Sequence, residues 1–205
     1  LALEGLLALP DTAPPVLYER ARAAHLLQDS AAAAKALRQF AEQAGGHCVI
    51  GGRHTGVYLA QLTAEAGDLR TALVVIRSVR ADTPSVGAGL MAQLLFANGE
   101  LDESEALTIT LLRGAPKDAS LYLLLSQIRE TDGRRVESMA ALERFLQATD
   151  CSPGKCGHRP PNVTVLARLA TLYLEDNLEE ERAFELGDQA LSLVEKPNWG
   201  AVYLA

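Results

Sequence analysis

The sequence predicts an all-α protein, a solenoid of antiparallel helix pairs. Of the 205 residues, 48% are hydrophobic but only 5% are aromatic, and alanine and leucine, which have high helix propensity, supply most of the apolar bulk. Clusters of β-branched residues, which strands favour, are scarce. A pattern of small and large apolar residues also recurs at intervals of 32 and 34 residues, a length that suits two helices joined by a tight turn.

Three glycines mark this repeat. Gly67, Gly99 and Gly133 are separated by 32 and 34 residues, and Gln28 and Asn177 stand in comparable contexts one period plus an insertion away. A small residue recurs seven positions before the marks: Ala60, Ala92, Ser126 and Ala170. A large apolar residue recurs eight positions before them: Leu59, Met91, Leu125 and Leu169. Another small residue recurs five positions after them: Ala33, Ala72, Ser104 and Ser138. Small residues let two helix backbones approach closely, so the pattern predicts packed pairs with their turns at the marks.

The spacing resembles the tetratricopeptide repeat (TPR), a helix–turn–helix unit of about 34 residues with a closing proline, here Pro84 and Pro116. The resemblance covers about residues 15–197 and implies a right-handed superhelical solenoid of about five repeats. We expect a single solenoid over 1–205, with units at 14–47, 53–86, 85–118, 119–150 and 161–197, partial units at 1–12 and 198–205, and loop insertions at 45–54 and 151–160. Neither end is polar, as a solenoid cap should be, so we expect flanking sequence or packing of these ends on something else.

The second insertion contains the motif CSPGKCGH, residues 151–158. A c-type haem would need C-x-x-C-H, which the spacing of Cys151, Cys156 and His158 does not provide. Three interpretations stay open. The two cysteines could form a disulfide around the Pro-Gly turn, they could be free thiols, or the three residues could bind zinc with a fourth ligand such as Asp150. We expect a loop without a cofactor, and zinc is the less favoured alternative.

The first insertion carries His47, Cys48 and His54 and is expected to be a glycine-rich connector. Consecutive helices pack roughly 10 Å apart, so two loops separated by three repeats should lie on the order of 30 Å from each other. The two Cys/His loops of one chain are therefore not expected to share a metal ion.

The predicted binding site is a row of polar residues on the first helices of the repeats. Gln61, Gln93 and Gln127 each lie six residues before a mark, and Arg22 and Thr171 continue the row. The resemblance implies that this row faces a concave groove, where carboxamides can bind an extended peptide backbone, and Phe96 and Leu123 would add apolar contacts. The alternative explanation for the recurring glutamines is that glutamine is a soluble residue with good helix propensity and has no binding role here.

The sequence predicts no enzyme, because it lacks the nucleophile-elbow, phosphate-loop and zinc-protease motifs. A net charge of −7 disfavours nucleic acid as a partner, and the apolar runs are too short to span a bilayer. We expect a non-catalytic scaffold that binds a protein or extended peptide, as bacterial envelope and secretion assembly factors with this repeat do. The alternatives are a repeat segment of a larger regulatory protein or enzyme, and a zinc-stabilised module. The C-x-x-x-x-C loop favours an exported, periplasmic location, whereas the sequence does not predict an oligomeric state.

Overall fold

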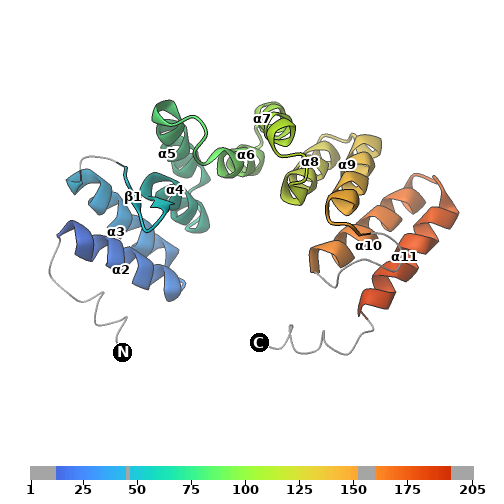
Figure 1. The fold of residues 1–205 in the computed structure, drawn as a ribbon, viewed down its shortest axis with the longest axis horizontal. Helices are drawn as coiled ribbons and strands as arrows, with labels where there is room; N and C mark the ends of the chain where they lie inside the picture. Colours follow the sequence, from blue (N-terminus) through green and yellow to red (C-terminus); the bar gives the residue numbers. More distant parts are fainter. Residues whose placement is uncertain (1–12, 45–46, 152–159, 195–205) are drawn as a thin grey trace. The chain divides into compact units, whose positions relative to one another are not determined.

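The computed structural model describes residues 13–44, 47–151 and 160–194 (Figure 1). In these ranges the chain forms ten α-helices and one two-stranded β-ribbon. The helices are α2 (Pro14–Leu26), α3 (Ser30–Gln43), α4 (Thr55–Glu65), α5 (Leu69–Asp82), α6 (Ala88–Ala97), α7 (Leu101–Gly114), α8 (Ala119–Thr131), α9 (Arg135–Ala148), α10 (Pro160–Glu175) and α11 (Glu180–Val194). The ribbon consists of β1 (Val49–Ile50) and β2 (Arg53–His54). The predicted all-α fold of helix pairs is confirmed, and the predicted partial units at 1–12 and 198–205 lie outside the described residues.

The repeat marks are the turns of the helix pairs. The residues at the five marks all have positive φ, between 51° and 89°; they are Gln28, Gly67, Gly99, Gly133 and Asn177. At each turn the same two backbone hydrogen bonds close the first helix; at the second pair, for example, the Gly67 N–H donates to the Ala64 carbonyl at 2.9 Å and the Asp68 N–H to the Thr63 carbonyl at 3.0 Å. This left-handed helix ending explains why glycine recurs at the mark.

The residue after the mark caps the N-terminus of the second helix in two of the pairs. The Asp29 carboxylate accepts a hydrogen bond from the Ala32 N–H at 2.9 Å, and the Asp68 carboxylate accepts one from the Thr71 N–H at 3.0 Å. Both are N-caps, which satisfy amide groups that have no partner inside the helix. The hydrogen bonds from Thr71 also lower the pKa of Asp68.

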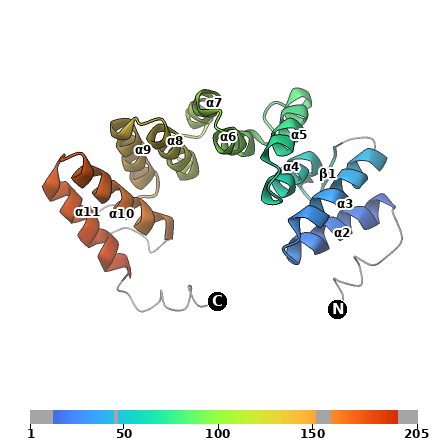
Figure 2. The ribbon, with the colours of Figure 1, turned by 180° about the vertical axis from the view of Figure 1, so that it is seen from behind.

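The chain divides into two compact bodies, residues 1–107 and 108–205. In the N-terminal body, α2 packs on α3 and α4 on α5, while α3 also contacts α4 and α5 contacts α6 (Figures 1 and 2). The small residues of the repeat lie where these helices approach, with Ala33, Ala60, Ala72 and Ala92 all fully buried. Large residues then fill the space between successive pairs; Leu37 and Leu62, for example, belong to one buried cluster.

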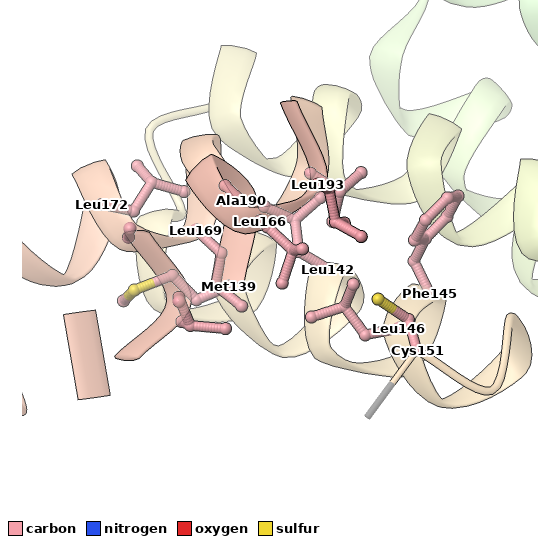
Figure 3. Close-up of a cluster of buried hydrophobic side chains, with 13 residues drawn as sticks. Met139, Leu142, Phe145, Leu146, Cys151, Leu166, Leu169, Leu172, Ala190 and Leu193 are labelled. Carbon is pink, nitrogen blue, oxygen red and sulfur yellow. The ribbon is translucent and has the colours of Figure 1, made fainter. Parts of the chain in front are cut away.

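The core of the C-terminal body is formed by α9, α10 and α11 (Figure 3). It is built from Met139, Leu142, Phe145 and Leu146 of α9, Leu166, Leu169 and Leu172 of α10, and Ala190 and Leu193 of α11. Cys151, just after α9, also belongs to this cluster and is only 9% exposed. Its side chain therefore lies in the core.

Candidate peptide-binding site

A hollow of about 540 Å³ lies between α4 and α6 in the N-terminal body. Its lining combines apolar side chains with two carboxamides and one carboxylate. The lining residues are Val57, Gln61, Ala64 and Glu65 of α4, and Leu90, Gln93, Leu94 and Ala97 of α6. The structure thus brings two of the predicted groove residues, Gln61 and Gln93, to one hollow.

Helix geometry places both glutamines at the surface of this hollow. Gln61 stands between the buried residues Ala60 and Leu62, and Gln93 stands between the buried residues Ala92 and Leu94. Successive residues of an α-helix point about 100° apart, so burying the two neighbours turns each carboxamide outward. Both glutamines are exposed.

Hydrogen bonds orient one of the two carboxamides. The Gln61 Nε2 donates to Glu65 Oε1 at 2.9 Å, which leaves the Gln61 carbonyl oxygen directed away from this partner. Glu65 Oε2 in turn accepts a hydrogen bond from the Ser30 hydroxyl at 3.2 Å and lies 3.4 Å from His25 Nδ1. Glu65 therefore ties α4 to both α2 and α3. The Gln93 carboxamide forms no hydrogen bond within the described part of the chain.

An aromatic cluster lies on the α2 side of Glu65. The Arg53 guanidinium sits 5.1 Å from the centroid of the Tyr58 ring, and the His25 ring meets the same tyrosine edge-on at 5.8 Å. Tyr58 is buried, which raises the pKa of its hydroxyl, while the Arg53 charge acts in the opposite direction. Sequence reasoning missed this cluster, since its members come from α2, β2 and α4.

Two other predicted groove residues of the N-terminal body do not line the hollow. Arg22 is exposed on α2, where its Nη1 donates to both carboxylate oxygens of Glu19 at 2.9 Å. Phe96 is half-buried on α6 and is absent from the lining. The groove role predicted for these two side chains stays a prediction.

The predicted groove residues of the C-terminal body occupy three different settings. Gln127 is exposed on α8. Leu123 is half-buried and packs against the core cluster of α9 and α10. Thr171 is exposed on α10, donates its hydroxyl to the Ala167 carbonyl at 2.9 Å, and lines a second hollow, between α10 and α11.

The insertion at 45–54, expected to be a glycine-rich connector, contains the β-ribbon. Val49 pairs with His54 and Ile50 with Arg53 across a turn at Gly51 and Gly52, both with positive φ. This is the geometry of a two-residue hairpin, for which the sequence I-G-G-R is a recognisable signal. The Cys48 N–H donates to the Thr55 hydroxyl at 2.9 Å, so the ribbon is also tied to the start of α4.

His47 packs beside this ribbon. Its ring centroid lies 6.1 Å from that of His54. Burial and the nearby His54 lower the pKa of His47, and the carboxylate of Asp82 partly opposes this shift. Cys48 is an exposed free thiol. No set of three or more His, Cys, Asp or Glu side chains in residues 13–44, 47–151 and 160–194 is arranged to hold a metal ion.

The CSPGKCGH motif falls largely outside this part of the chain. Cys151 belongs to the core, but Cys156 and His158 lie outside the described residues. The predicted disulfide and the alternative zinc site therefore stay predictions. Among the helices that the structure describes, none combines the length and the apolar character needed to cross a bilayer.

No protein-family model matches the sequence, and no curated protein matches it. Solved structures do. MamA 41-end from Desulfovibrio magneticus RS-1 is 14% identical, with a TM-score of 0.71 over 93% of this chain and 99% of that one. A structure from Podosopora anserina with nearly identical TPR-like repeats of the kinesin light chain type is 17% identical, with a TM-score of 0.65 over 91% and 97%. At such identities the likeness concerns the fold, and the chain has the TPR-like helical-repeat fold.

Proposed function

We propose that this chain is a non-catalytic scaffold that holds an extended segment of a partner protein in the hollow between α4 and α6. The observation that carries the proposal is the placement of Gln61 and Gln93 at one hollow with an otherwise mainly apolar lining. A carboxamide both donates and accepts, so it can match the alternating N–H and C=O groups of a peptide backbone.

The two glutamines would contribute differently. Gln61 already donates to Glu65, so its carbonyl oxygen is the group that would accept a peptide N–H. Gln93 would offer both its carbonyl oxygen and its amide. Apolar side chains of the segment would contact Val57, Leu90 and Leu94. Each net hydrogen bond would contribute about 1 kcal/mol, so much of the affinity would come from the apolar contacts.

The test uses a linear peptide selected from a random display library against the intact chain. We expect the double variant Gln61→Ala/Gln93→Ala to bind this peptide about tenfold or more weakly, because two hydrogen bonds are lost. Gln39→Ala is the matched control, since Gln39 is an exposed glutamine on α3 outside the hollow. Unchanged affinity of the double variant, measured by calorimetry, would contradict the proposal, and so would a library that yields no binder.

We further propose that the chain works in an oxidising compartment such as the periplasm, as an assembly factor of the envelope or of secretion. The support is the spacing of Cys151 and Cys156 around a Pro-Gly turn, which suits a small disulfide loop. The state of these thiols tests this proposal independently of peptide binding.

A further inference from the structure

The hollow between α10 and α11 exposes an unusual amount of apolar surface. It has a volume of about 440 Å³ and is lined mainly by apolar side chains. Four large ones are widely exposed: Leu174 (46%), Phe184 (60%), Leu191 (59%) and Val194 (49%). Leaving such side chains in water forgoes about 1.5–3 kcal/mol for each one that could be buried, so an occupant would be strongly favoured.

The repeat itself indicates what kind of element belongs there. Phe184 follows the small buried residue of α11, and its counterparts in three earlier second helices are all buried. They are Ala34 of α3 (5% exposed), Leu73 of α5 (4%) and Met139 of α9 (4%). Each counterpart shares a buried cluster with the helix that follows it: Ala34 with α4, Leu73 with α6 and Met139 with α10. Phe184 is thus a residue of the type that a following first helix covers.

The α10 wall of the hollow leads to the same conclusion. Three residues of α10 lie as far before the mark Asn177 as three residues of α4 lie before the mark Gly67. Ala167 corresponds to Val57, Thr171 to Gln61 and Leu174 to Ala64. Val57 and Ala64 pack against the buried cluster that contains Leu94 and Leu95 of α6, the first helix of the next pair. Both walls of the α10–α11 hollow are therefore surfaces against which the next first helix packs.

We propose that residues 198–205 of this chain occupy the α10–α11 hollow, with Trp199 against Phe184 and Leu191. The start of α10 contains Pro161-Asn162 followed by the apolar Val163, and the same Pro-Asn pair recurs 36 residues later, at 197–198, followed by Trp199. The segment 198–205, NWGAVYLA, carries no charged side chain, as an occupant of an apolar hollow requires. Val194 ends α11 and lines the hollow, and three residues span up to about 10 Å, a helix-to-helix distance. This proposal does not depend on the proposed function.

Tryptophan fluorescence tests it directly, because Trp199 is the single tryptophan of the chain. In the intact chain we expect emission at shorter wavelength, and weaker quenching by acrylamide, than in a free peptide of residues 195–205. Leu191→Asp and Phe184→Asp place a charge in the hollow, so each should move both readings toward those of the peptide. Val74→Asp is the matched control, since Val74 is 67% exposed on α5 and lies outside the hollow.

Three results would overturn the proposal. Trp199 could be quenched as easily in the chain as in the peptide, which would leave the hollow without this occupant. Its protection could survive both hollow variants, which would place it elsewhere. Protection could also be lost on dilution as the molecular mass halves, which would make a second copy of the chain the occupant. Circular dichroism of each variant checks that helix content is unchanged, as expected for substitutions at exposed positions.

Discussion

The Ser104 hydroxyl donates a hydrogen bond to the carbonyl oxygen of Ala92 at 2.8 Å, which joins the two helices of the third pair. Both residues are fully buried. Ser138 holds the equivalent position in the next repeat and is also fully buried, but its hydroxyl has no hydrogen-bond partner among the described residues. Two serines at the same repeat position therefore have opposite energetic roles.

This difference predicts opposite effects of the same substitution. We expect Ser104→Ala to lower the free energy of unfolding by about 1 kcal/mol, because a buried hydrogen bond is lost. Ser138→Ala should leave it unchanged or raise it by up to about 1 kcal/mol, because a buried unpaired hydroxyl is removed. Urea unfolding of the two variants measures both values, and equal losses would contradict the assignment.

The left-handed turns predict a second pair of effects. Gly67 has a φ of +89° with open space around it, so Gly67→Ala should cost about 1 kcal/mol through backbone strain alone. Gln28 has a φ of +60°, so Gln28→Gly should instead raise the free energy of unfolding by up to about 1 kcal/mol. If urea unfolding shows that Gly67→Ala raises the free energy of unfolding, the backbone at this turn is not left-handed.

Gly56 is predicted to tolerate no side chain. A Cβ on Gly56 would lie 2.4 Å from Val79 Cγ2 and 2.7 Å from His47 Cγ, so Gly56→Ala should cost about 1–3 kcal/mol. Gly89→Ala is the control, because a Cβ there meets no atom within 4 Å. We expect thermal unfolding to show a clear loss for Gly56→Ala and no loss for Gly89→Ala.

Stability near the ribbon should depend on pH through His47. Its folded-state pKa is lowered from 6.5, so the stability linked to the neutral ring is present above about pH 6.5 and is lost as the pH falls through the lowered value. An NMR titration of His47 should therefore show a midpoint below 6.5. His54→Gln should raise this midpoint and Asp82→Asn should lower it further, because these neighbours act in opposite directions. A midpoint at or above 6.5 would contradict the burial of the ring.

Thiol labelling distinguishes the interpretations of the CSPGKCGH motif. Alkylation of the unfolded chain without reductant should label one thiol, Cys48, which is exposed and free, and reductant should expose two more. Intact mass spectrometry counts the labels. Three labels without reductant would remove the disulfide and the support for an oxidising compartment, and a native mass heavier by one zinc ion would favour the metal site instead.

The repeat period, the marks and the small residues could be predicted because each is a local requirement of a helix turn or a close helix contact. Gln61 and Gln93 could be placed together for the same reason, since one repeat separates them. The β-ribbon had a local sequence signal in Gly51 and Gly52, the turn of the hairpin, but the insertion was expected to be a glycine-rich connector. The Arg53–Tyr58–His25 cluster depends on which side chains meet in space, and periodicity carries no information on that. Arg22 and Glu19 are instead three residues apart on one helix, a spacing at which an ion pair could have been predicted.

The turns inside four of the pairs are uniform, with three residues, 27–29, 66–68, 98–100 and 132–134, between one helix and the next. The connections between pairs vary, and one of them contains the whole β-ribbon. The turn of the fifth pair, residues 176–179, is one residue longer, and the small residue Ala183 of α11 is still buried, so the added residue is taken up before the second helix begins. A residue inserted between pairs would only lengthen a surface segment. Because the connections between pairs already differ in length, grafted epitopes, tags or new loops should be tolerated best there, which makes those junctions the sites at which this scaffold can be re-engineered.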